Sequence, residues 1–257
     1  MATTAGRFRE ATKSKLTEAW YRKRLRLIAK QVRLIAQEYD EDTDPVTAAA
    51  QIAARLFDYS VTIDEWATAV TSTMLKRVAD DDFDTWTKTS EKLSRETKKR
   101  LKDAVIGPEY ARLQREQVDL IKSIPLDAAK KVHQWTQTAL SEGQRYSSIA
   151  KKIKTELGDV SDTKAVLIAR TETARARSTF TQARSTAVGS THYVWHTVGD
   201  GAVRPRHAHL DGKIFAWSDP PVCDEGKGGS PVRAHPGCVW NCRCWAEPLF
   251  PKTEYSK

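Results

Sequence analysis

The sequence predicts an α+β protein: a mostly α-helical N-terminal region, residues 1–142, followed by a small α+β module, residues 143–257, with a short antiparallel sheet and a zinc-stapled loop region. Three observations predict this architecture. Apolar residues recur at three- and four-residue steps over most of residues 14–190, as in amphipathic helices. After Gly189 the residues become β-branched and aromatic between turn signals, as in strands. All four cysteines and four of the six histidines lie between Tyr193 and Trp245.

The first helices are predicted from an apolar stripe and from capping residues. The stripe comprises Leu25, Ile28, Val32, Ile35 and Tyr39. Asp44 followed by Pro45 is typical of a helix start, and we expect that helix to end near Asp58. Thr62 and Glu65 have the spacing of a capping box, which predicts that another helix starts there.

The acidic run at residues 80–82 interrupts this pattern, and a charged helix is expected over about residues 84–105. Gly107-Pro108 ends it, because proline excludes its predecessor from helical geometry. Two further helices are expected at about 109–122 and 126–141, the second closed by Gly143. Ser147 and Ser161 are then predicted to cap helices over about 148–157 and 162–188, with Gly158 and Gly189 as their stops.

Three short strands are expected in the C-terminal module. Residues 191–198 are β-branched and aromatic and run into the turn at residues 199–201. Residues 213–217 predict a second strand, and residues 244–250 a third. Tryptophans 195, 217, 240 and 245 are interpreted as core residues, because aromatic area dominates small cores, and base stacking is the minor alternative.

The formal net charge of +9 is unevenly distributed. Residues 7–33 carry a net charge of +8 and residues 145–184 carry +5. Concentrated positive charge of this kind suggests contact with a polyanion such as DNA or with an acidic protein surface, and a solvated helix face is the alternative. On the helix around Arg170, Glu172, Arg175 and Arg177 we favour a salt-bridge network over a phosphate clamp.

Cysteine usage points to a metal site. The sequence has no run of about 18 apolar residues and no hydrophobic N-terminal segment, so synthesis in a cytosol is expected, where thiols stay reduced. Zinc takes four tetrahedral ligands from thiolates and imidazoles, and Cys242 and Cys244 form a short chelating step. His235 and His207 complete the predicted set of four, with the zinc in a structural role.

Alternatives to this ligand set stay open. Cys223 and Cys238 could replace the histidines as ligands, or pair as a disulfide in an oxidising medium. A metal-free, hydrogen-bonded cluster of the same histidines and cysteines is also open.

Six sequence pieces occur in an order that resembles a known family. They are Tyr146-Ser147-x-Ile149-Ala150, Ile168-Ala169-Arg170-Thr171-Glu172-Thr173-x-Arg175, Trp195 with Gly199-Asp200, Arg204-Pro205-x-His207-x-x-Leu210-Asp211-Gly212-Lys213, His235-Pro236-Gly237, and Cys242-Arg243-Cys244. Over about residues 143–250 the chain is similar to the phage Mu F-like head morphogenesis family. The resemblance implies a minor capsid protein of a tailed bacteriophage, present in few copies.

The resemblance also implies where such a protein acts. It is expected in the virion interior near the portal vertex, and in the host cytoplasm during procapsid assembly. Its expected partners are the phage portal protein, the major capsid protein and packaged double-stranded DNA reached through the basic helices, with no membrane contact. Head morphogenesis, DNA packaging or genome delivery is the expected role.

An enzymatic role is not expected. Two thiolates and two histidines fill a zinc shell and leave no vacant position for catalysis. The sequence has no Walker-type phosphate loop, no HExxH and no Gly-x-Ser-x-Gly. Asp211 before Gly212 is interpreted as a turn residue. The alternative function is a head-carried nucleic-acid-processing enzyme or toxin-like effector, which would need an open metal position in a basic cleft.

Overall fold

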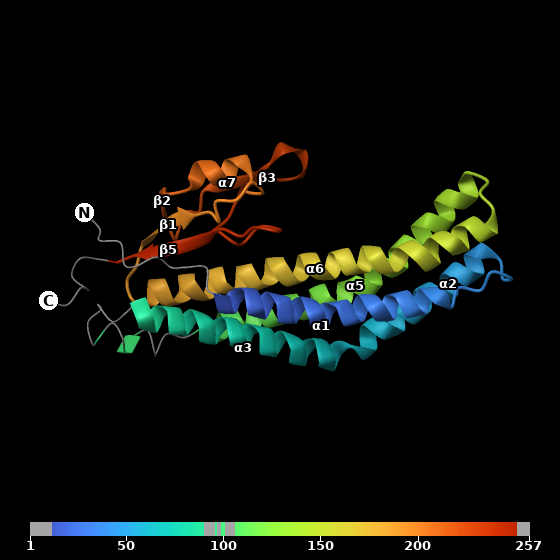
Figure 1. Cartoon of the computed structure of the whole chain (residues 1–257), viewed down its shortest axis with the longest axis horizontal. Helices are drawn as coiled ribbons and strands as arrows, with labels where there is room; N and C mark the ends of the chain where they lie inside the picture. The colour runs from blue at the N-terminus through green and yellow to red at the C-terminus, as the bar shows by residue number, and fades with distance from the viewer. Residues whose placement is uncertain (1–11, 90–95, 97–98, 101–105, 251–257) are drawn as a thin grey trace. The chain divides into compact units, whose positions relative to one another are not determined.

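The computed structural model describes residues 12–89, 96, 99–100 and 106–250 of the chain, and the figures use the same element labels as the text (Figure 1). The named helices are α1 (Thr12–Gln37), α2 (Pro45–Thr62), α3 (Asp64–Thr89), α5 (Gly107–Ser141), α6 (Tyr146–Ala187) and the short α7 (Pro205–Leu210). The strands are β1 (His192–His196), β2 (Ile214–Ala216), β3 (Val222–Glu225), β4 (Pro231–Arg233) and β5 (Trp245–Leu249). The predicted α+β class is confirmed: long helices precede a short antiparallel sheet.

The chain forms two compact units. One comprises Glu18–Thr73 and Gln114–Arg170 and is called the helical unit below. The other comprises Met1–Thr17, Met74–Leu113 and Thr171–Lys257 and is called the sheet unit, although of its residues only those named above are described. The predicted domain boundary at residues 142/143 falls in the turn between α5 and α6, within the helical unit, and it stays a prediction.

Within the described residues, no helix is long and apolar enough to cross a membrane. The predicted charged helix over residues 84–105, and the start of the basic segment at residues 7–33, lie partly outside the described residues.

The helical unit is built on the predicted apolar stripe of α1. All five of its members, from Leu25 to Tyr39, are buried. The start of α2 is also as predicted, because the Asp44 carboxylate accepts hydrogen bonds from the backbone N–H groups of Val46 and Thr47. Its end was placed too early, since α2 continues to Thr62. The Thr62 hydroxyl donates to the Tyr59 carbonyl instead of capping α3, so the predicted capping box is wrong.

Two predicted helix pairs are single helices. The predicted break at Pro125 is absent, and α5 continues through it. Proline removes the backbone donor to the Ile121 carbonyl, and the helix continues despite this one missing bond. In the same turn the Ser123 hydroxyl donates to the Leu120 carbonyl, and Lys164 of α6 donates to the Ser123 carbonyl. The predicted stop at Gly158 and cap at Ser161 are also wrong, because α6 runs through both and the Ser161 hydroxyl donates to the Leu157 carbonyl.

Gly158 has a packing role in α6. A methyl group built at this position would lie 2.6 Å from Nε and 2.9 Å from Cβ of Arg33 on α1. Arg33 crosses the helix there because its guanidinium pairs with Asp159 at 2.6 Å. The glycine therefore permits close approach of two helices of the helical unit rather than ending one of them.

The acidic run at residues 80–82 does not break α3, contrary to the prediction. Asp82 is buried in the sheet unit, where its carboxylate accepts from the Thr181 hydroxyl at 2.6 Å and pairs with Arg184 at 2.9 Å. Arg184 also donates to the Ala79 carbonyl. The negative charge of Asp82, which would otherwise disfavour burial of this helix face, is therefore paired with residues of α6. As a result α3 continues to Thr89.

The sheet unit contains two small sheets. β1 lies between β2 and β5 in an antiparallel sheet with the order β2-β1-β5, and β3 pairs with β4 as a separate hairpin. The three strands that were predicted are β1, β2 and β5, each shorter than predicted by two or three residues. The β3–β4 hairpin was missed. Trp86, Val188 and Phe250 form a second apolar cluster of this unit.

Gly158→Ala should destabilise the protein, although alanine alone favours a helix over glycine by about 1 kcal/mol. Overpacking against Arg33 is expected to cost about 1–3 kcal/mol, so the net change in unfolding free energy should be unfavourable. Gly107→Ala is the matched control, because nothing lies within 4 Å of a methyl group built there. Urea denaturation measures both, and a Gly158→Ala protein as stable as the Gly107→Ala protein contradicts the packing role.

Burial raises the pKa of Asp82 to about 6, against the opposing effects of Thr181 and Arg184. A carboxyl whose pKa is higher in the folded than in the unfolded state binds its proton more tightly when folded. Its contribution to stability is therefore largest below about pH 4 and declines by about 1.4 kcal/mol per pH unit until about pH 6.

Urea denaturation of the wild-type and Asp82→Asn proteins between pH 4 and 7 tests this dependence. The unfolding free energy of the wild type, relative to that of Asp82→Asn, should fall as the pH rises across that window and level off above it. Asp80→Asn, at an exposed position two residues earlier, should leave the pH dependence of the wild type unchanged. A pH-independent difference for Asp82→Asn would show that the carboxyl titrates normally.

Candidate metal centre

His207 is positioned by α7, a six-residue helix that the sequence analysis did not predict. Arg204 is extended, and Pro205 at the first helical position fixes the backbone for the helix that follows. The end of α7 is tied to β1, because the N–H of Gly212 donates to the Trp195 carbonyl and the N–H of Trp195 donates to the Lys213 carbonyl. His207 therefore faces the interior and is 2 % exposed.

Cys242 and Cys244 lie on the loop that enters β5. Asn241 has a φ of 58°, in the left-handed region, and its N–H donates to the Thr171 hydroxyl on α6. Gly237 in the same loop has a φ of 85°, and a methyl group there would lie 3.2 Å from the carbonyl oxygens of Ala174 and Cys244. The loop thus packs closely on α6 and turns both cysteine side chains into the module.

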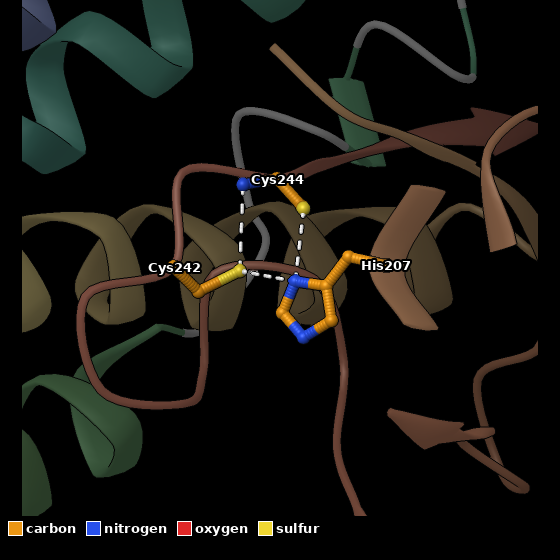
Figure 2. Close-up of side chains that lie close together, drawn as sticks. All are labelled: His207, Cys242 and Cys244. Carbon is orange, nitrogen blue, oxygen red and sulfur yellow. Dashed lines mark hydrogen bonds between the residues drawn. The ribbon is translucent and has the colours of Figure 1, made fainter. Parts of the chain in front are cut away.

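The three side chains converge on one point (Figure 2). Nδ1 of His207 lies 3.5 Å from Sγ of Cys242 and 3.4 Å from Sγ of Cys244. All three donor atoms lie within 4.8 Å of one another, and all three residues are buried. The helix α7 and the loop before β5, more than 30 residues apart in the chain, meet through these atoms.

These distances fit a tetrahedral metal ion. With metal–sulfur bonds of about 2.3 Å and metal–nitrogen bonds of about 2.0–2.1 Å, tetrahedral angles place nitrogen and sulfur ligands about 3.6 Å apart. The two observed nitrogen–sulfur distances lie within 0.2 Å of that value. The donor set, two soft thiolates and an imidazole, is also the type that binds zinc. The cluster could therefore hold a metal ion.

Backbone donors favour the ionised form of Cys242. Its sulfur accepts hydrogen bonds from the N–H groups of Gly237 and Cys244, each at 3.4 Å. Interactions with Cys244 and His207 lower the pKa of Cys242 to about 4. The same interaction with Cys242, together with burial, raises the pKa of Cys244.

His207 is the cationic partner of this thiolate. Hydrogen bonding to Cys223 and Cys242 raises the pKa of His207 to about 9. Without a metal, the centre at neutral pH therefore holds an imidazolium, a thiolate and a neutral thiol. A metal ion has to displace the protons of His207 and Cys244, because only the deprotonated groups are ligands.

Three of the four predicted ligands are thus brought together, and the fourth is not among them. Nδ1 of His235 lies 3.1 Å from the Tyr193 hydroxyl, and its ring packs against Tyr193 and Trp217 with centroids 5.4 and 5.5 Å apart. Burial lowers the pKa of His235. In this position it contributes to the core of the module.

Cys223 and Cys238 lie outside the three-residue cluster. Cys223 is fully buried, next to the His207 ring, and its thiol donates to the Val232 carbonyl at 3.6 Å across the β3–β4 hairpin. Burial raises the pKa of Cys238. In this structure all four cysteines are free thiols, not disulfides.

The other residues singled out in the sequence are mostly structural. Trp195 and Trp217 are in the core as predicted, whereas Trp240 is half exposed and was wrongly placed there. Asp211 accepts a hydrogen bond from the Thr197 N–H at 2.7 Å, as expected of a turn residue. On α6, the salt-bridge interpretation holds for Arg175, which pairs with buried Glu172 at 3.7 Å.

A small cavity adjoins the cluster. Its volume is about 50 Å³, and its walls comprise the three cluster residues together with Val198, Ala202, Val203, Arg204, Asn241 and Arg243. Arg243 is held by Asp200 through two hydrogen bonds, and Arg204 donates to the Trp240 carbonyl at 2.7 Å. This cavity was not predicted from the sequence, because α7, which positions His207 in its wall, was not predicted.

Comparison with known proteins shows what this module is similar to. The family model described as Phage Mu protein F like protein matches residues 130–247, a segment that includes the whole cluster. An uncharacterized protein of Haemophilus influenzae is 34% identical over 137 residues, which are 53% of this chain. The chain spans only 28% of the length of that relative. No solved structure matches the chain significantly.

The match confirms the resemblance seen in the sequence and extends it toward the N-terminus by about thirteen residues. It suggests a phage head morphogenesis protein and points to no enzyme family. Over residues 130–247, the chain is similar to the phage Mu F-like family.

Proposed function

We propose that this protein is a minor capsid protein of a tailed bacteriophage that acts near the portal during procapsid assembly, DNA packaging or genome delivery. The observation that carries the proposal is the family match over residues 130–247. Portal protein and major capsid protein are the proposed partners, with DNA as a further contact of exposed basic residues. The proposed location is the capsid interior.

Within this role, a structural zinc ion holds the sheet unit together through His207, Cys242 and Cys244. Its core cluster is small, and Cys223, Cys242 and Cys244 are three of its eight buried members. A module with so little apolar area depends on an additional crosslink, and a metal supplies one. Zinc fits because its ligand distances match those of the cluster and because it has no redox chemistry of its own.

The alternative function, a head-carried nucleic-acid-processing enzyme or effector, is favoured by one observation. The cavity at the cluster is lined by two arginines, which is the setting that an open metal position in a basic cleft requires. The Cys242 sulfur and the His207 imidazole line this cavity, but as ligands of the proposed ion they are not available as nucleophile and general base, so the assembly role remains the proposal.

The zinc is tested by elemental analysis of protein purified without chelators. We expect about one zinc per chain, because one complete cluster is present in the described residues. Cys242→Ser, Cys244→Ser and His207→Ala should each lose the metal and lower the thermal midpoint, since the binding energy of a structural zinc contributes to folding. His209→Ala, an exposed position on the same helix, is the matched control. A metal-free preparation with unchanged stability would falsify the zinc proposal.

The assembly role is tested in a phage from which this gene has been deleted. Capsid shells should still form, but few infectious particles should result. Supplying His207→Ala in trans should not restore infectivity, whereas Asp211→Asn should, because the amide keeps the oxygen that accepts from the Thr197 N–H. Filled, normal heads that lose infectivity only with Asp211→Asn would argue for chemistry at this site instead.

A further inference from the structure

We propose that the metal centre keeps one coordination position open to a small anion from solution, which enters through the cavity between α7 and the Cys242–Cys244 loop. This inference rests on the proposed zinc site. It differs from the sequence-based expectation of a closed, four-ligand shell.

The ligand set is the first observation. Among the residues that the structure describes, His207, Cys242 and Cys244 are the one group of histidine, cysteine and carboxylate side chains close enough to share an ion. His235 is engaged with Tyr193 and Trp217, and the Cys223 thiol bonds to Val232. A tetrahedral ion held by three protein ligands has one position left for a ligand from outside.

The cavity is the second observation. All three cluster residues line it, so its volume of about 50 Å³ lies directly against the proposed ion. A water molecule occupies about 30 Å³ in the liquid, so the cavity has room for about one or two heavy atoms next to the ion, and the far end of a short linear anion would extend toward the opening. A larger substrate does not fit without movement of the loops.

The third observation is the charge of the residues that line the cavity, which favours an anion as the ligand. Two thiolates neutralise a divalent ion, so the centre itself does not repel an anion. Arg204 and Arg243 are among the residues that line the cavity, whereas their carboxylate partners, Asp224 and Asp200, do not line it. A small anion at the open position is therefore stabilised both by the ion and by neighbouring positive charge.

Cobalt substitution of the full-length protein tests the inference. Co²⁺ in a thiolate site absorbs visible light, and its absorption depends on the number and type of ligands. Addition of thiocyanate should shift the spectrum and saturate. In Arg243→Gln the thiocyanate concentration for half-maximal shift should rise about tenfold, because a charge-assisted contact is lost. His235→Ala, outside the cluster, should respond like the wild type.

The outcomes separate the two proposals. Failure to bind cobalt through thiolates overturns the metal site itself. Cobalt binding with a spectrum that does not respond to thiocyanate overturns the open position alone. In that case, loss of the four-coordinate spectrum in His235→Ala, Cys223→Ser or Cys238→Ser identifies the protein ligand that closes the shell.

Discussion

The sheet unit depends on the meeting of His207 with the thiols of Cys242 and Cys244. Around its main sheet, with strands of five, three and five residues, one apolar cluster has eight buried members. A cluster of that size offsets little of the entropy lost when the surrounding loops become ordered. The three-residue contact joins α7 directly to the loop before β5, in addition to the backbone hydrogen bonds that tie the end of α7 to β1.

The loop around Cys242 is shaped to serve that contact. Gly237 adopts a positive φ in a space where a side chain would meet the backbone of α6 and of Cys244. From there its N–H points to the Cys242 sulfur, and the N–H of Cys244 approaches the same sulfur from the other side. Two backbone donors and the imidazole stabilise negative charge on one sulfur. The backbone conformation of this loop therefore favours the ionised form of the Cys242 thiol.

The features that were predicted correctly from the sequence depend on residues that are close together in the chain. The strands β1, β2 and β5 follow from β-branched and aromatic residues between turns, and the α2 cap follows from Asp44 and Pro45. Helix breaks were predicted where none occur, because local propensity was overruled by contacts distant in sequence. Gly158 accommodates Arg33, Lys164 of α6 donates to the Ser123 carbonyl in the turn before Pro125, and Arg184 partners Asp82.

The same limit applies to the candidate metal ligands. Cys242 and Cys244, which the structure brings together with His207, could be picked out as a pair because a separation of two residues suffices for chelation. His235 was included since a Pro-Gly turn brings it near in sequence, but nearness along the chain does not fix the direction of a ring. That direction is set by Tyr193 and Trp217, which lie on or next to strands of the main sheet.

Ion pairs hold some of the basic side chains, which reduces the positively charged surface that a polyanion could contact. Within the helical unit, arginines of the first basic segment pair with acidic residues of the second: Arg26 pairs with Asp162 and Arg33 with Asp159. Such exposed pairs contribute at most about 1 kcal/mol each, but they hold the guanidinium groups toward α6. Lys23, Arg24 and Lys30 are exposed on α1. If the proposed contact with DNA runs through α1, these cations would supply it, and it would be weaker than the net charge of the whole segment implies because Arg26 and Arg33 are paired.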